Sequence, residues 1–260
     1  MLMKDFTAWQ ETTSRYRQVT TRNLMVSQKQ AFPEALFDIP IVPPDITPLR
    51  LISIRSEKET ASIFYFGRID LGLAPMKTDT PENLLILKFI RDPAGWRFDT
   101  TQMMNLGGVP DIRAAFQKGD YKALQTPEFA PPAQAPETPV PCPIPDFIAF
   151  VSVVSLGHET NVTINDYTYS DIGDSGLKTI VIGGLKKGAN PVSVKTKVLR
   201  PDPSHPKLDL SVTISVVSDL ANPDQPSSGE RRIFNLHPTR AEDYQPEWKF
   251  TVDPERSRAQ

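Results

Sequence analysis

The strongest constraint on how this chain folds is a proline-rich segment from Thr126 to Pro145, which holds eight prolines in twenty residues. Proline fixes the backbone φ angle and has no N–H to donate, so such a segment forms neither a helix nor a central strand. It should run extended, as a semi-rigid spacer of about 3 Å per residue. The sequence before it indicates helix and strand, and the sequence after it indicates strand only. We therefore expect two domains, residues 1–125 and 146–260, joined by a linker over residues 126–145.

Composition gives no indication of several classes of partner. At 260 residues, with 39% hydrophobic and 23% charged residues, each half of the chain can bury a core. The net charge of −2 and the pI near 6.0 leave no basic surface of the kind that binds nucleic acid or an anionic membrane. No apolar run approaches the roughly 20 residues that span a bilayer, so we expect a soluble chain without a membrane span.

Two features bear on the cellular compartment. The single cysteine, Cys142, lies inside the proline-rich segment, so it forms no internal disulfide, and we expect an exposed, unactivated thiol. The N-terminus, Met1 to Phe6, lacks the charged, apolar and small-residue regions of a signal peptide. The chain is therefore either cytoplasmic or a secreted protein from which the leader has been removed.

The first domain begins with a helical pattern and continues with strands. Residues Asp5 to Gln30 contain neither glycine nor proline, and their large apolar residues recur at three- and four-residue steps, which predicts one amphipathic helix. Runs rich in β-branched and apolar residues follow, separated by polar turns, and they predict two antiparallel hairpins. The expected strands are Leu49–Ser56, Ala61–Asp70, Asn83–Arg91 and Trp96–Met103, and a short helix is expected over Pro110–Leu124.

This order of elements, with the ending Gly95-Trp-Arg-Phe98, resembles the cystatin/NTF2-like group of α+β domains. The resemblance implies that the helix packs across a curved antiparallel sheet, whose concave side can enclose a pocket. Enzymes of that group place an Asp, His or Tyr there, but this half contains no His, and Asp70 and Asp99 lie near strand ends. We therefore expect a non-catalytic module without a cofactor. A cavity would be lined by aromatic residues that can equally well fill a core, namely Trp9, Tyr16, Phe64, Phe66 and Trp96.

The second domain is expected to be an antiparallel, all-β sandwich. Short β-rich runs recur between turn residues, and several alternate strictly, as in Leu208–Val217, where apolar and polar residues take turns. Asn161–Asn165 and the loop Gly183–Asn190 resemble β-sandwich modules, Ig-like or jelly-roll-like, of bacterial envelope proteins. That resemblance implies a periplasmic, cell-surface or secreted protein. The expected strands are Phe147–Leu156, Thr160–Asn165, Tyr167–Ser170, Leu177–Ile182, Val192–Leu199, Leu208–Val217, Arg231–Leu236 and Trp248–Val252.

No catalytic or metal-binding motif in the sequence is complete. Gly173-Asp-Ser-Gly176 matches the surroundings of a chymotrypsin-like serine nucleophile, but the sequence that carries the histidine base is absent, so we interpret it as a loop. The histidines His158, His205 and His237 have no ligand spacing for zinc. The densest acidic group offers carboxylates to Ca²⁺ without the ligand ladder of an EF-hand, and otherwise forms a solvated loop: Glu159, Asp166, Asp171 and Asp174.

The sequence favours a non-catalytic interaction or assembly protein that works outside the cytoplasm of a bacterium, with another protein as its partner. A stiff spacer sets the distance between two binding surfaces and is ill suited to building one active site. The alternative is a small-ligand binder or an enzyme that uses an NTF2-like cavity. A third hypothesis is carbohydrate binding, in which Tyr167 and Tyr169, or Trp248, stack on sugar rings.

Overall fold

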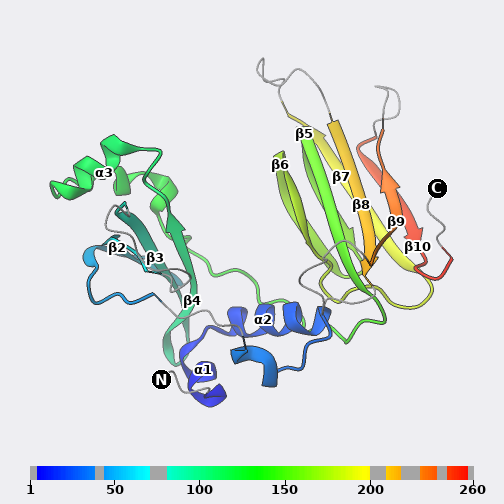
Figure 1. The fold of residues 1–260 in the computed structure, drawn as a ribbon, viewed down its shortest axis with the longest axis horizontal. Coiled ribbons are helices and arrows are strands. Elements are labelled where there is room, and N and C mark those ends of the chain that lie inside the picture. Colours follow the sequence, from blue (N-terminus) through cyan, green and yellow to red (C-terminus); the bar gives the residue numbers. More distant parts are fainter. Residues whose placement is uncertain are drawn as a thin grey trace. The chain divides into compact units, whose positions relative to one another are not determined.

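The computed structural model describes residues 5–38, 44–70, 81–199, 209–217, 229–238 and 245–256. The chain is mostly β, with 47% of residues in strands and 18% in helices, and its strands form two sheets (Figure 1). It divides into two compact units. The division differs from the expected one, because part of the N-terminal sequence belongs to the second unit. Unit 1 comprises Met1–Thr21 and Pro33–Val140, and unit 2 comprises Arg22–Phe32 and Pro141–Gln260.

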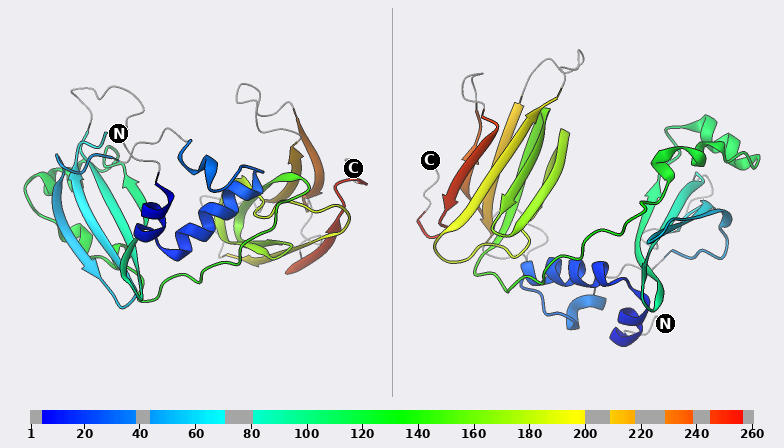
Figure 2. Two further views of the ribbon diagram at one scale, coloured as in Figure 1. Left: turned by 90° about the horizontal axis from the view of Figure 1, so that it is seen from below. Right: turned by 180° about the vertical axis from the view of Figure 1, so that it is seen from behind.

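The sheet of unit 1 is a four-stranded antiparallel meander, which follows the two predicted hairpins (Figure 2). Its strands are β1 (Arg50–Ser56), β2 (Thr60–Gly67), β3 (Asn83–Asp92) and β4 (Gly95–Met104), and a 3-10 helix at Glu34–Phe37 precedes them. The strands lie in the order β1-β2-β3-β4. Between β3 and β4 the carboxylate of Asp92 accepts the Ala94 N–H at 2.8 Å, and Gly95 supplies a φ of 124°. These two residues close the turn.

One face of this sheet carries the core of unit 1, covered by a helix and two short 3-10 helices. Phe66 of β2 meets Phe116 of the helix edge to face, with ring centroids 5.6 Å apart. Phe64 meets Phe129 in the same way, at 6.2 Å. Because Phe129 belongs to the proline-rich segment, that segment begins inside the core. The covering elements are α3 (Pro110–Gln117) and the 3-10 helices Lys122–Gln125 and Pro127–Phe129.

The prediction of a single N-terminal helix is wrong. Instead of one helix over Asp5–Gln30 that lies across the sheet, the structure has α1 (Phe6–Thr12) and α2 (Arg15–Ser27). Between them, Ser14 donates its N–H to the carbonyl of Phe98 in β4 at 2.7 Å. Its hydroxyl accepts an N–H from the first turn of α2 at 3.0 Å, as an N-cap does. None of the helices in the described part of the chain is long and apolar enough to cross a membrane.

The sheet of unit 2 has six antiparallel strands. They are β5 (Ile148–Ile164), β6 (Tyr167–Ile180), β7 (Asn190–Val198), β8 (Asp209–Val217), β9 (Glu230–Leu236) and β10 (Glu247–Val252). On one edge, β5 pairs along its length with β6. On its other edge, the first part of β5 pairs with β8 and the second part with β7, and these lead on to β9 and β10 (Figure 1). The longest strand is thus the centre of the unit.

A bend in β5 explains how it divides between two neighbours. From Ala149 to Ser155 its buried positions are odd-numbered, and from His158 to Ile164 they are even-numbered. The residues between Ser155 and Glu159 stand opposite the shorter stretch Gly173–Ser175 of β6, so β5 bulges there. The sequence pattern predicts two strands in this region. The buried positions change from odd to even numbers at a bulge, and the strand continues through it without a break.

The bent sheet closes around the core of unit 2. Phe234 of β9 and Phe250 of β10, on the two end strands of the path, have ring centroids 4.9 Å apart. Buried aliphatic or aromatic residues from all six strands fill the space that the sheet encloses. Trp248, considered above for sugar stacking, belongs to this core and is 8% exposed. Its indole ring is therefore needed for packing.

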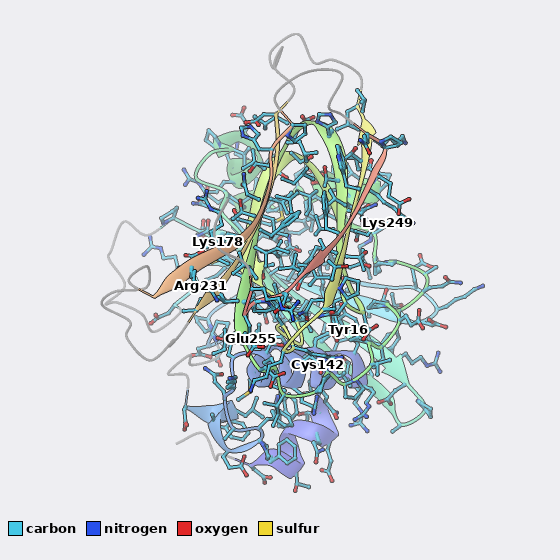
Figure 3. All side chains as sticks on the ribbon, turned by 90° about the vertical axis from the view of Figure 1, so that its right-hand side faces the viewer. Tyr16, Cys142, Lys178, Arg231, Lys249 and Glu255 are labelled. Carbon is cyan, nitrogen blue, oxygen red and sulfur yellow. The ribbon has the colours of Figure 1, made fainter. Side chains whose placement is uncertain are left out.

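The end of the proline-rich segment is anchored within unit 2 by the second half of α2 (Figure 3). Cys142 is 5% exposed, so the expectation of an exposed thiol is wrong. Its N–H donates to the Asn23 side chain at 2.8 Å, and its carbonyl accepts from Arg22 at 2.9 Å. One turn further along α2, the hydroxyl of Ser27 accepts the Gly183 N–H at 2.7 Å. An extended segment leaves its peptide groups unpaired, and here α2 supplies their partners.

The first half of the segment is attached to unit 1. The hydroxyl of Thr60 donates to the carbonyl of Pro132, and the N–H of Ala135 donates to the Glu59 carboxylate at 2.9 Å. The linker expected over residues 126–145 is therefore divided: its beginning packs on unit 1, its end packs on unit 2, and the boundary follows Val140.

Candidate functional site

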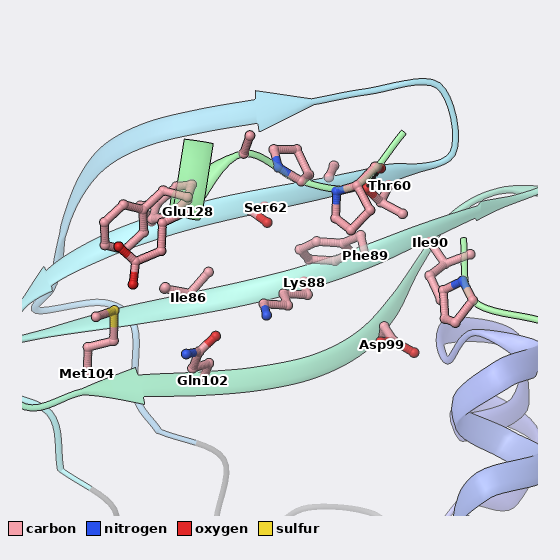
Figure 4. A pocket seen from close by; sticks show the side chains of 17 residues that line it. Thr60, Ser62, Ile86, Lys88, Phe89, Ile90, Asp99, Gln102, Met104 and Glu128 are labelled. Atoms are coloured by element: carbon pink, nitrogen blue, oxygen red, sulfur yellow. Dashed lines mark hydrogen bonds between the residues drawn. The ribbon is translucent and has the colours of Figure 1, made fainter. Parts of the chain in front are cut away.

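Unit 1 contains a cavity of about 190 Å³ between the core face of its sheet and the proline-rich segment. Strands β2, β3 and β4 form the floor, and residues Glu128 to Pro136 form the roof (Figure 4). Prolines make the roof apolar and conformationally restricted, so this wall is preformed. The floor includes Ser62 and Phe64 of β2, Ile86 and Lys88 of β3, and Gln102 and Met104 of β4.

Strand register brings these floor residues together. Ser62 of β2 pairs with Lys88 of β3. Two residues along, Phe64 pairs with Ile86, which in turn pairs with Gln102 of β4. Alternate residues of a strand face the same side, so all five side chains belong to one face. The floor therefore places the polar side chains of Ser62, Lys88 and Gln102 beside the apolar ones of Phe64 and Ile86.

Three polar side chains of the floor have unused hydrogen-bonding capacity. Lys88 and Gln102 project into the cavity from neighbouring strands (Figure 4), and neither makes a hydrogen bond or ion pair within the described residues. The carboxylate of Asp99 is already engaged, because it accepts the Ser14 hydroxyl at 2.7 Å. Glu128, on the roof, is exposed to solvent. Ser62 likewise makes no side-chain hydrogen bond within the described residues, so the cavity offers one ammonium, one amide and one hydroxyl to a bound molecule.

The aromatic cavity expected from the sequence is not assembled. Of the five residues proposed for it, only Phe64 lines the cavity. Phe66 belongs to the adjacent core. The N-terminal helix breaks at Ser14, so it does not lay its aromatic residues over the sheet. The other three are set apart from the cavity: Trp9 stacks on Phe6, Tyr16 is half-buried in α2, and Trp96 is 44% exposed.

Sequence reasoning missed Lys88, Gln102 and the proline roof. One signal was available, because Lys88 is the single charged residue in the apolar run Leu84–Ile90. A charge inside such a run faces either solvent or a polar site. No comparable signal indicates the roof, since the contact between a proline-rich segment and a sheet face depends on tertiary packing.

The tyrosine pair considered for sugar binding is used inside unit 2. The Tyr169 hydroxyl accepts the Ile182 N–H at 2.7 Å and donates to the Ile180 carbonyl at 3.1 Å. The Tyr167 hydroxyl accepts from the side-chain amide of Asn23. Both hydroxyls therefore hold unit 2 together, and the pair gives carbohydrate binding no support.

Tyr169 also predicts a pH dependence of stability. Burial, partly offset by the Ile182 N–H, raises the pKa of Tyr169 from 10.0 to about 12. Because the phenol ionises first in the unfolded chain, its stabilising contribution is complete below pH 10 and is lost between pH 10 and 12. Over that range the free energy of unfolding should fall by about 1.4 kcal/mol per pH unit more steeply than in Tyr169→Phe. Urea denaturation of both proteins measures this, and parallel profiles would contradict it.

The structure does not bring together the four carboxylates proposed for a cation: Glu159, Asp166, Asp171 and Asp174. Within the described residues there is no group of three His, Cys, Asp or Glu side chains that could hold a metal ion. The Asp174 carboxylate accepts the N–H of Gly157 at 2.7 Å, and Asp171 donates its N–H to Asn161 at 2.8 Å. Both aspartates have positive φ angles, 42° and 58°, on β6. Within the described residues β6 pairs only with β5, and irregular, charged positions on its other edge hinder pairing with another chain.

The structure also shows where the serine motif and two of the three histidines lie. Gly173–Gly176 lies inside β6 and not in a loop, so the resemblance to a protease is confined to the sequence. His158 is buried in β5. His237 lies 3.3 Å from the Asp209 carboxylate at the surface, and His205 lies outside the described residues.

Comparison with known proteins identifies no relative. No protein-family model, no curated protein and no solved structure matches this chain. The function is therefore inferred from the cavity of unit 1 and its lining residues.

Proposed function

We propose that the protein is a non-catalytic binding protein that holds a small amphipathic molecule in the cavity of unit 1. The observation that carries this proposal is the cavity itself, which combines apolar side chains with an ammonium, an amide and a hydroxyl unused by the described residues. Ligand sites are typically concave, mostly apolar and supplied with a few placed polar groups. A cavity of about 150 Å³ in a protein core takes up benzene. At about 190 Å³, this cavity is somewhat larger and can take up a single ring of that size.

The chemistry of the lining favours binding over catalysis. General acid–base catalysis needs a titratable group aimed at the reacting atoms, and covalent catalysis needs a nucleophile beside a base. Among the described lining residues, Asp99 is held by Ser14, and Glu128 faces solvent from the roof. Lys88 stands opposite Ser62 across β2 and β3, but no hydrogen bond joins the two side chains within the described residues, so they do not form an activated nucleophile–base pair. The lining offers contacts and charge, which is what binding requires.

The finer fold assignments belong to the same proposal. Unit 1 would be a cystatin/NTF2-like α+β domain in which the proline-rich segment, and not a long helix, closes the pocket. Unit 2 would be an Ig-like or jelly-roll-like sandwich made by bending one sheet. The antiparallel order of the strands in each unit supports both assignments.

A protein-interaction role outside the cytoplasm is a second candidate, which the edge of the unit 1 sheet favours. Strand β1 is an edge strand, and its Leu51 and Ile54 side chains are 51% and 64% exposed. Exposed apolar edge strands can accept a strand from a partner. In this case Ile54→Lys should reduce crosslinking of the chain to a partner protein. Lys58→Glu, in the turn that follows β1, should leave crosslinking unchanged.

A blocking substitution tests the ligand-binding proposal. Gln102→Trp places a large ring in the cavity from β4, and Thr101→Trp places the same ring on the opposite face of that strand. In NMR titrations with benzoate and benzamide, the unmodified protein and Thr101→Trp should show shifts at Ile86, with dissociation constants of about 1 mM. Gln102→Trp should weaken binding by about tenfold or more. Without shifts at cavity residues of the unmodified protein, the proposal fails.

A further inference from the structure

We infer that the ligand of unit 1 is an anion with an apolar body, and that Lys88 and Gln102 together hold its carboxylate. This inference rests on the proposed function and specifies the chemical class that the cavity selects. It depends on three observations, which are the pair of donors, the placement of the neighbouring carboxylates, and the apolar side chains next to the donors.

The first observation is an ammonium group that has no counterion in the described part of the chain. Lys88 is half-buried on the floor, between apolar neighbours on β3. A cation that has lost part of its hydration is stabilised by an anion that also accepts its hydrogen bonds. No described residue around the floor supplies such an anion to Lys88. A ligand carboxylate would do so.

Gln102, which is exposed, supplies a second donor next to the first. Lys88 pairs with Thr100, so Gln102 is its diagonal neighbour across β3 and β4. Diagonal neighbours on one face of a sheet are about 7–8 Å apart at the backbone, which is within reach of two long side chains. Both side chains project into the same part of the cavity (Figure 4). One carboxylate can therefore accept from the ammonium with one oxygen and from the amide with the other.

The two carboxylates that line the cavity do not neutralise Lys88. Asp99 accepts the Ser14 hydroxyl at 2.7 Å and points away from Lys88 in Figure 4. Glu128 belongs to the roof and is exposed, so water and salt screen its charge. Glu128 would still oppose an anion weakly, and removing its charge should strengthen anion binding.

The apolar side chains next to Lys88 and Gln102 determine the body of the ligand. Phe64, Ile86 and Met104 line the floor there, and Phe129 lines the roof. Burial of a ring or a short aliphatic chain against these side chains contributes about 25 cal/mol for each Å² of apolar surface removed from water. An aromatic or short-chain carboxylic acid combines such a body with the required head group.

Three matched probes test the charge of the head group. Benzoate, benzamide and benzylamine share a ring and differ in charge, and each is titrated against the full chain by NMR. We expect benzoate to bind about tenfold more tightly than benzamide, and benzylamine to bind most weakly. Lys88→Met should abolish the preference for benzoate, whereas Lys88→Arg should keep it. Lys118→Met removes the same charge from an exposed position outside the cavity and should change nothing.

The outcomes separate this inference from the proposal on which it rests. If benzamide or benzylamine binds as tightly as benzoate, or if Lys88→Met keeps the preference, the cavity binds ligands but does not select anions. If no probe shifts the cavity residues, ligand binding itself is refuted. Glu128→Gln should tighten benzoate binding by about twofold, because it removes the weak repulsion from the roof. Benzylamine is a cation, so tighter binding of benzylamine to that variant would contradict the expectation that Glu128 repels anions and attracts cations.

Discussion

A fragment that begins at Pro141 should be less stable than unit 2 in the intact chain by about 3–5 kcal/mol, and at the upper end of that range it should not fold. Such a fragment contains every strand of the six-stranded sheet but lacks Arg22–Phe32. A division of the chain at residue 146, as the sequence pattern suggests, predicts an independent domain instead. The free energies of unfolding that the two divisions predict for the fragment differ by a large fraction of the stability of an ordinary domain.

The loss follows from the contacts that the second half of α2 makes within unit 2. Asn23 and Ser27 are 1% and 0% exposed, and they accept the N–H groups of Cys142 and Gly183. Each such bond contributes about 1 kcal/mol net. The apolar side chains of Met25 and Val26, in the same segment, are also buried. The ordering of the segment offsets part of this gain, which leaves a few kcal/mol.

Trp248 allows unit 2 to be followed selectively. A chain with Trp9→Phe and Trp96→Phe keeps Trp248, 8% exposed in the core of unit 2, as its single tryptophan. Urea denaturation of that chain and of the fragment, followed by fluorescence, gives the two free energies of unfolding. A peptide of residues 15–32 added to the fragment should restore stability, and the same peptide with Asn23→Ala should restore less. Equal midpoints for chain and fragment would show that α2 contributes nothing.

The strands were predictable because alternation along a strand is a local signal. Leu210, Val212 and Ile214 alternate with polar residues in the sequence, and all three are fully buried in β8. The same signal predicts a false break in β5, because the bulge after Ser155 reverses the parity of the buried positions. A bulge depends on the strands that pair on either side, which local sequence does not specify.

The helix and the proline-rich segment depend on contacts between residues far apart in the sequence. The apolar periodicity of Asp5–Gln30 continues through Ser14, but the helix does not. There the N–H of Ser14 bonds to the carbonyl of Phe98, and the Ser14 hydroxyl caps the next helix. Cys142 has no neighbour in the sequence that indicates its burial against Asn23. Stiffness follows from the prolines, but stiffness does not decide whether such a segment crosses solvent or packs on a surface.

The candidate site shows the same division between local and long-range information. A cavity on the sheet of the first unit is among the sequence-based hypotheses, and of the residues proposed for it Phe64 lines the cavity of the structure. The other aromatics were chosen as if a helix covered the sheet. In the structure the segment Glu128–Pro136 covers it, so polar residues of β3 and β4 line the cavity in their place.

Gly184→Ala should destabilise unit 2 by about 3–5 kcal/mol, whereas Gly188→Ala should cost about 1 kcal/mol. Both glycines have left-handed φ angles, 51° and 78°, so both variants incur backbone strain. The two sites differ in the space around them. A Cβ at Gly184 would lie 2.5 Å from the Cβ of Pro145 and closer still to the carbonyl oxygen of Phe147. At Gly188 nothing lies within 4 Å.

The comparison tests the contacts that the turn before Leu185 makes with Pro145 and with the carbonyl of Phe147. The backbone cannot easily move away, because Phe147 and Leu185 exchange N–H···O bonds of 2.9 and 3.0 Å beside the turn. Urea denaturation followed at Trp248 measures both variants, and their free energies of unfolding should differ by about 2 kcal/mol or more. A similar small loss in both would mean that Pro145 yields to the added methyl group. In that case the close approach of Gly184 to Pro145 would not be needed to hold the end of the proline-rich segment on unit 2.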